Sequence, residues 1–159
     1  MTRSINSAGL SLIKHFEGCR LRTYLDAGGR PTIGVGHLIL PGEDFSKGIT
    51  QQQADQLLQH DLISKENGVE RLVQVELGDN QFSALVSFAF NLGLGNLAAS
   101  TLLKKIKVGD SAGIACEWVK WCHDHGQILK GLVLRRQAEL ALFNTPDDVS
   151  VSLDDIENQ

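Results

Sequence analysis

Two acidic residues near the start of the chain, Glu17 and Asp26, are candidates for the cleavage of a glycosidic bond. That reaction needs a neutral acid to protonate the leaving oxygen, and an anion to activate water, stabilise positive charge or attack the sugar carbon. An apolar surrounding keeps a carboxylic acid protonated near neutral pH, whereas water keeps one ionised. The chain has 19 Asp and Glu residues, so two unrelated surface carboxylates would be the simpler explanation of the residue types alone.

The element that carries the first acid is a predicted helix. It begins after Ser7, a good N-cap residue, and ends at Gly18, which suits the left-handed position after a helix. Leu10, Ile13 and Glu17 share one face of this helix. The carboxyl group of Glu17 therefore ends an apolar stripe, as the acid of such a pair requires.

The second acid falls in a predicted β-hairpin. Segments 21–25 and 32–36 are short and rich in β-branched or aromatic residues, and Gly28-Gly29 lies between them. Pro31 stands at the start of the second strand, where a missing N–H does little harm. Water around this turn would keep Asp26 ionised.

The rest of the chain is predicted to be helical. A capping-box pattern at Thr50–Gln53 opens a long helix that runs toward Val73, with Gly68 as a candidate break. Further helices are predicted over four segments: 81–91, 100–107, 111–123 and 132–143. The 81–91 helix is apolar on most sides and should be buried. We therefore expect an α+β fold that is mostly α, with a small β-hairpin lobe, a larger helical lobe and a cleft between them.

The spacing of three residues resembles the catalytic signature of a known family. Glu17 is followed after eight intervening residues by Asp26 and after five more by Thr32, which opens the sequence TIGVGH. This pattern is similar to that of the bacteriophage-type lysozymes, the muramidase endolysins of glycoside hydrolase family 24. The resemblance continues, in the same order along the chain, at Ala84–Gly93, Ser100–Leu103, Glu117–Trp121, Gly131-Leu132, Arg135-Arg136 and Glu139.

The resemblance implies a role for each of the three residues. Glu17 would be the general acid, Asp26 would position or activate the attacking group, and Thr32 would orient the nucleophilic water. The family is regarded as inverting, which implies carboxyl groups about 6.5–9.5 Å apart with a water between them.

Other positions are carried over with partial matches. Leu38, Phe90 and Thr101 fall where the family contacts its saccharide, and His37 matches a family histidine for which we expect a structural role. Of the two tryptophans, Trp118 and Trp121, we expect at least one to pack in the core rather than to stack on a sugar. No metal and no cofactor are expected.

The cysteines favour reduced thiols over disulfides. Cys19, Cys116 and Cys122 are an odd number in a chain whose first residues lack the apolar core of a secretory signal. The run Cys122–His125 could suggest metal ligands. Adjacent side chains on a helix point in different directions, however, and no second cluster accompanies the run.

Size and charge exclude several classes of protein. A chain of 159 residues, 42% hydrophobic, fits one globular domain, which we place at residues 1–146, and it has no apolar run long enough to span a bilayer. Residues 147–159 are predicted to be an acidic, mobile tail. Residues 1–143 carry a net charge of +1, which does not suit nucleic-acid binding. A local basic cluster could attract an anionic polymer or could simply be solvated: Lys14, Arg20, Arg22 and Arg30.

The resemblance implies hydrolysis of the β-1,4 bond between N-acetylmuramic acid and N-acetylglucosamine in bacterial peptidoglycan. It implies a monomeric endolysin without membrane insertion. The protein would accumulate in the host cytoplasm and need a holin to reach the periplasm and cell wall. Two alternatives stay open, a secreted antibacterial effector with the same chemistry and a non-catalytic peptidoglycan-binding protein of the same fold.

Overall fold

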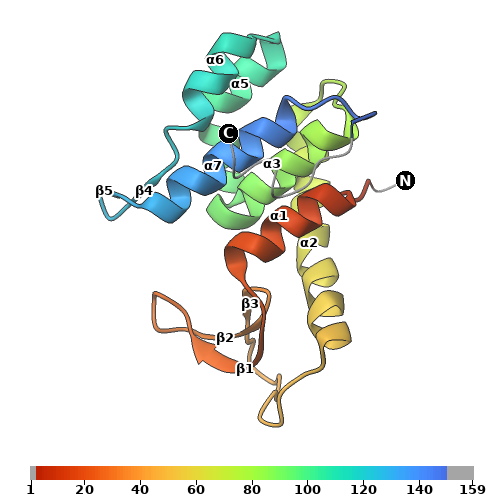
Figure 1. The fold of residues 1–159 in the computed structure, drawn as a ribbon, viewed down its shortest axis with the longest axis vertical. Coiled ribbons are helices and arrows are strands. Elements are labelled where there is room, and N and C mark those ends of the chain that lie inside the picture. The colour runs from red at the N-terminus through yellow and green to blue at the C-terminus, as the bar shows by residue number, and fades with distance from the viewer. Residues whose placement is uncertain (1–2, 150–159) are drawn as a thin grey trace. The chain divides into compact units, whose positions relative to one another are not determined.

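The computed structural model describes residues 3–149, which divide into two compact units (Figure 1). Unit 2, as we call Ile13–Ile63, holds a small three-stranded sheet; unit 1, the described residues on either side of it, is mainly helical. The boundaries fall within α1 (Ser7–Glu17) and α2 (Gln51–Val73). A mostly helical chain with a small antiparallel sheet confirms the predicted fold class.

The sheet of unit 2 has three antiparallel strands in the order β1-β2-β3. They are β1 (Arg20–Leu25), β2 (Pro31–Gly34) and β3 (His37–Leu38). The second strand was predicted to run through residue 36, but it ends at Gly34. Gly34 and Gly36 both have positive φ, at 66° and 69°, and the chain turns there into β3. The hairpin prediction is therefore correct, and β3 is an addition to it.

His37 fastens β3 to the rest of unit 2. The residue is 5% exposed, its Nδ1 lies 2.7 Å from Oδ2 of Asp61 on α2, and its Nε2 lies 2.9 Å from Oε1 of Glu43. Burial alone lowers the pKa of His37, but the hydrogen bonds to Glu43 and Asp61 outweigh it and raise the pKa above 6.5. Because each ring nitrogen faces a carboxylate, the protonated ring can donate a hydrogen bond on both sides, which is why these contacts favour it. These contacts are those of a structural residue.

The other elements lie mainly in unit 1, and two of them differ from the prediction. The predicted helix 111–123 ends early, and a two-stranded hairpin follows because His125 and Gly126 both adopt positive φ. The long helix α2 continues through Gly68 without a break. The remaining elements are α3 (Asp79–Leu92), α4 (Leu94–Ala99), α5 (Thr101–Val108), α6 (Ser111–Trp118), β4 (His123–Asp124), β5 (Gln127–Ile128) and α7 (Lys130–Phe143).

A buried ion cluster ties α3 and α6 to α7. The carboxylate of Glu139 accepts hydrogen bonds from Oγ of Ser87 (2.6 Å) and Nε1 of Trp118 (3.2 Å). Its Oε1 also lies 2.7 Å from Nε of Arg136, an ion pair too poorly aligned to count as a hydrogen bond. Arg136 donates in turn to Oδ1 of Asn91 on α3 at 2.8 Å. Trp118 is therefore a core residue, and Arg136 and Glu139 belong to the framework of unit 1.

Asp147 caps α3 from the far end of the chain. The N-cap residue of this helix is Gly78, which has no side chain to accept a hydrogen bond. Asp147 supplies the acceptors, because its Oδ2 lies 3.0 Å from N of Asp79 and its Oδ1 lies 2.8 Å from N of Asn80. Asp147, the first residue of the predicted tail 147–159, therefore holds a helix terminus, and the bounds of that tail stay a prediction. Residues 150–159 lie outside the described residues.

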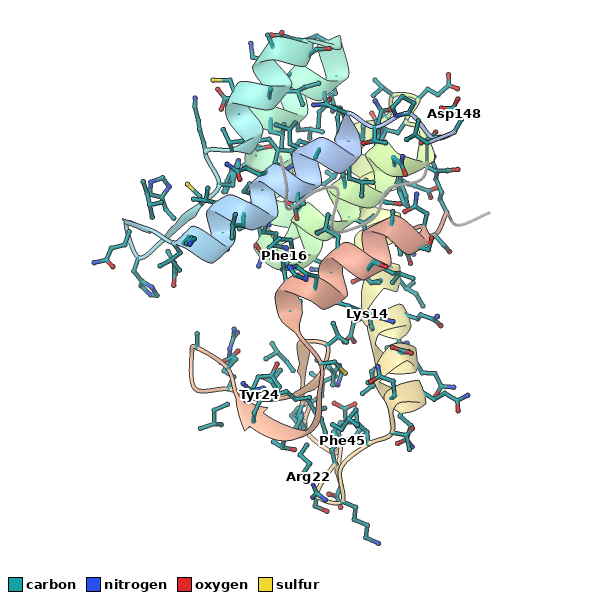
Figure 2. The ribbon with its side chains drawn as sticks, in the orientation of Figure 1. Lys14, Phe16, Arg22, Tyr24, Phe45 and Asp148 are labelled. Atoms are coloured by element: carbon teal, nitrogen blue, oxygen red, sulfur yellow. The ribbon has the colours of Figure 1, made fainter. Side chains whose placement is uncertain are left out.

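Replacing Asp147 with alanine should lower the free energy of unfolding by about 1–2 kcal/mol, because two N–H groups at the start of α3 lose their acceptor. Asp148 provides the matched control (Figure 2). It is exposed, and within residues 3–149 it makes no hydrogen bond or ion pair. Thermal melting of Asp147→Ala and Asp148→Ala should separate the two variants, and equal melting temperatures would contradict the capping role.

Replacing His37 with glutamine should destabilise the protein by about 2 kcal/mol below pH 6.5, since hydrogen bonds to charged groups contribute about 1.5–3 kcal/mol. The pKa of His37 is raised in the folded state. Its stabilising contribution is thus complete below 6.5 and declines as the pH rises through the folded pKa. Denaturant titrations at several pH values measure the free energy of unfolding of both proteins. The difference in this free energy between wild type and variant should become smaller as the pH rises. A gap that widens would show that the neutral ring is the stabilising form.

Candidate active site

Glu17 is the last residue of α1 and is half-buried. The helix buries Leu12 and Ile13 completely, and Gly18 ends it with a φ of 71°, as the sequence predicts. The carboxylate lies against the turn between β2 and β3, where a Cβ added at Gly36 would stand only 3.1 Å from Oε2 of Glu17. Gly36 therefore provides both the positive φ of the turn and the space that the acid occupies.

Asp26 follows β1 and organises the turn into β2. Its Oδ1 accepts hydrogen bonds from N of Gly28 (2.9 Å) and N of Arg30 (2.8 Å), and its Oδ2 accepts one from Nε of Arg30 (3.0 Å). The backbone hydrogen bond from Arg30 is the main cause that lowers the pKa of Asp26, and the Arg30 guanidinium adds to it. The group is thus held as a carboxylate, which is the ionisation state that its predicted role requires.

Thr32 lies on β2 and is only 2% exposed. Its Oγ1 donates a hydrogen bond to the carbonyl oxygen of Arg30 at 2.9 Å, and the same carbonyl accepts from N of Asp26 at 2.9 Å. One peptide group therefore links Asp26 to Thr32. Because the hydroxyl proton of Thr32 is committed to Arg30, the oxygen keeps its lone pairs for a donor such as water.

Three residues form a row across one face of the sheet. Thr32 lies opposite Tyr24 on β1 and opposite Leu38 on β3, and directly opposed residues point to the same side of a sheet. Ile33 and His37 are paired in the same way and are buried. Tyr24, Thr32 and Leu38 therefore lie in one row on the face of the sheet that carries Thr32, a candidate catalytic residue.

The raised pKa of Tyr24 indicates that both candidate acids, Glu17 and Asp26, lie near this row. Burial raises the pKa of its hydroxyl most, the carboxylate of Glu17 raises it next, and Asp26 raises it further. Figure 2 shows the Tyr24 side chain at the sheet of unit 2. The sequence motifs do not single out Tyr24, and the available signal is its place two residues before Asp26 in a predicted strand.

The predicted substrate contacts divide between the units. Leu38 belongs to unit 2 and is 39% exposed, so it is accessible beside Thr32. Phe90 is half-buried on α3, and Thr101 is exposed as the first residue of α5; both belong to unit 1. Glu17, Asp26 and Thr32 all lie in unit 2, so the candidate catalytic residues share one compact body.

The remaining candidates are the three cysteines and possible metal ligands. Cys19 and Cys116 are exposed free thiols, and Cys122 is a buried one. Within residues 3–149, no three His, Cys, Asp or Glu side chains gather where they could hold a metal ion. In the same part of the chain, no helix is long and apolar enough to cross a membrane.

Comparisons with known proteins give the family. A family model described as phage lysozyme matches residues 14–139. The endolysin of Bacillus phage PZA is 42% identical over 92% of this chain, and that of Salmonella phage P22 is 37% identical over 87%. This chain spans 58% of the Bacillus phage protein but 97% of the P22 protein.

A solved structure agrees with these relatives. The endolysin from Escherichia coli O157:H7 phage FAHEc1 superposes with a TM-score of 0.82 at 32% identity, covering 94% of this chain and 98% of that one. The fold is thus lysozyme-like. With a family model over most of the sequence and relatives of this identity, the chain belongs to the phage lysozyme family.

Proposed function

We propose that the protein is an endolysin muramidase. It hydrolyses the β-1,4 bond between N-acetylmuramic acid and N-acetylglucosamine in bacterial peptidoglycan. The observation that carries this proposal is the arrangement in unit 2, where the ionised Asp26 and the hydroxyl of Thr32 are both hydrogen-bonded to the main chain of Arg30. Glu17 lies near the same row of side chains, since its carboxyl group is close enough to Tyr24, opposite Thr32, to raise the pKa of the Tyr24 hydroxyl when it is ionised. Membership of the phage lysozyme family supports the class of substrate.

The proposed reaction is a single displacement at the anomeric carbon. Glu17 transfers its proton to the bridging oxygen as the bond between that oxygen and the anomeric carbon breaks. A water molecule attacks the carbon from the opposite face and gives up one proton. An inverting reaction of this kind needs about 6.5–9.5 Å between the two carboxyl groups to accommodate the water.

Asp26 and Thr32 both hold the attacking water, and each has a different role. The lowered pKa of Asp26 makes it a weak base, so its carboxylate mainly orients the water and stabilises positive charge on the sugar ring. It accepts the proton as the new bond forms. Thr32 accepts a hydrogen bond from the same water, since its own proton is directed to Arg30. No step in this scheme requires a metal or a cofactor.

The proposed biological setting is lysis of a bacterial host by a phage or prophage. The protein would collect in the host cytoplasm as a monomer and reach the wall through a holin lesion. An exported antibacterial effector would use the same site for the same reaction. A non-catalytic wall-binding protein would use the fold without cleavage.

Replacing Glu17 with glutamine should reduce turnover by about 10²–10⁴-fold, because the amide cannot donate the proton that a general acid supplies. Purified peptidoglycan is digested with the wild type, with Glu17→Gln and with the control Glu70→Gln, which changes an exposed acid on α2. Mass analysis of the products should show muropeptides with reducing ends for the wild type and the control. Anhydro ends would indicate transglycosylation, and an active Glu17→Gln variant would remove Glu17 from the mechanism.

Replacing Arg30 with glutamine should shift the acid limb of the activity profile to higher pH. The variant loses the guanidinium that lowers the pKa of Asp26 but keeps the main-chain N–H and carbonyl that hydrogen-bond to Asp26 and Thr32. Asp26 would then be protonated at a higher pH. Arg22→Gln removes the same charge from β1 and serves as the control. Superimposable acid limbs for all three proteins would mean that the ionisation of Asp26 does not control activity.

A further inference from the structure

Arg20 is an exposed cation fixed on an aromatic ring in the row that carries Thr32. Its guanidinium carbon lies 4.6 Å from the centroid of the Tyr24 ring, and Tyr24 lies opposite Thr32. Arginine often stacks on aromatic faces in this way, with its N–H groups still available at the edge of the plane. The stack therefore restricts the guanidinium without using its hydrogen-bonding capacity.

The strand is irregular at this point. Arg20 and Tyr24 are four residues apart on β1, but their partners on β2, Gly34 and Thr32, are only two apart. Four residues of a regular strand would span about 13 Å. The irregularity takes up the extra residues, so the long Arg20 side chain can cover the Tyr24 ring. A bulge that re-aims a side chain is a common feature beside active sites.

The guanidinium has no acidic partner. Among residues 3–149, no carboxylate lies within ion-pair distance of Arg20, and no hydrogen bond from its side chain is found. Arg30 differs from Arg20 in this respect, because its Nε already donates a hydrogen bond to Oδ2 of Asp26 at 3.0 Å. Arg20 thus presents an exposed planar set of donors, and the ligand that matches such a fork is a carboxylate held by two parallel hydrogen bonds.

The position of Arg20 suggests where that carboxylate comes from. Tyr24 lies within electrostatic reach of both Glu17 and Asp26, so a ligand on Arg20 is held close to the bond that is cut. In peptidoglycan the muramic acid beside that bond carries a lactyl group, to which a short peptide with free carboxylates is attached. A stem of this kind leaves the glycan next to the scissile bond.

We propose that Arg20, supported by the ring of Tyr24, binds a carboxylate carried by the muramic acid residue at the cleavage site and so selects stem-bearing glycan. This inference rests on the proposed muramidase function. On stem-bearing strands this carboxylate belongs to the peptide stem, because the lactyl carboxyl group is bound to the stem in an amide and becomes free only when the stem is removed. Arg20 is therefore a specificity-determining residue rather than a catalytic one.

The test compares enzyme variants on matched glycan strands. The first substrate is uncrosslinked peptidoglycan with its stems, the second is the same material with its carboxylates converted to amides, and the third is the same strands after an amidase has removed the stems. Arg20→Gln should raise KM on the first substrate by about tenfold, the size expected from a lost hydrogen bond to a charged group, with kcat nearly unchanged. Arg20→Lys should recover part of the loss, since it restores the charge without the planar fork.

The substrate arms show which group is bound. On amidated strands, wild type and Arg20→Gln should have the same KM. A difference that disappears on amidase-treated strands supports binding of the stem carboxylate, and one that persists there shows that Arg20 also accepts the lactyl carboxylate that the amidase frees. Arg22→Gln removes the same charge from the same strand and should leave KM unchanged on every substrate.

Three results would overturn the proposal. An equal loss from Arg20→Gln on amidated and untreated strands would show a structural role, and equal losses from Arg20→Gln and Arg22→Gln would show only long-range attraction. A loss confined to kcat would place Arg20 in the chemical step. Failure of the muramidase function itself would look different, because the wild type would then release no fragments from any substrate.

Discussion

The main chain of Arg30 is the constraint on which the candidate site depends. Its N–H donates to the carboxylate of Asp26, and its carbonyl accepts from the backbone of Asp26 and from the hydroxyl of Thr32. The turn between β1 and β2 therefore cannot relax without moving both the anion and the hydroxyl. Preorganised groups of this kind need no rearrangement during a reaction, which is where most of their catalytic benefit arises. Glu17 is fixed separately, by the end of α1 and by the space over Gly36.

The protein uses its other charges differently. His37 is enclosed by Asp61 and Glu43, and Glu139 is enclosed by arginines, a serine and a tryptophan, so each charge is neutralised within the framework. Asp26 is hydrogen-bonded too, but all its donors lie in the short turn that it closes, and its side chain stays 22% exposed. Buried and paired charges hold the two units in shape, and the site keeps its charges near the surface, where a polar substrate can reach them.

Local patterns in the sequence predicted the parts of the fold that are fixed locally. The helix before Gly18 and the hairpin around Gly28-Gly29 follow from capping, apolar period and turn chemistry, and they are the elements that hold Glu17 and Asp26. Strand β3 escaped prediction because two residues are too few for an alternating pattern. The early end of α6 was missed because Gly126 indicates a break but not the hairpin that surrounds it.

Partners far apart in the chain could not be predicted. The contacts of His37 with Asp61, and of Asp147 with the start of α3, join segments 24 and 67 to 68 residues apart, and no periodicity connects them. The resemblance supplied the roles of Glu17, Asp26 and Thr32, but it could not show that Arg30 links two of them or that Arg20 covers Tyr24. Those relations depend on the register of one short hairpin.

The candidate catalytic residues come from a single stretch, 17–32, whereas the proposed sugar contacts are spread over both units. This separation lets the two tasks change independently during evolution. A phage that meets a host with a different wall can alter exposed positions such as Leu38 or Thr101 one at a time and keep its chemistry intact. Inside the short stretch such freedom is absent, because one inserted residue in the turn would separate Asp26 from Thr32 and abolish both roles at once.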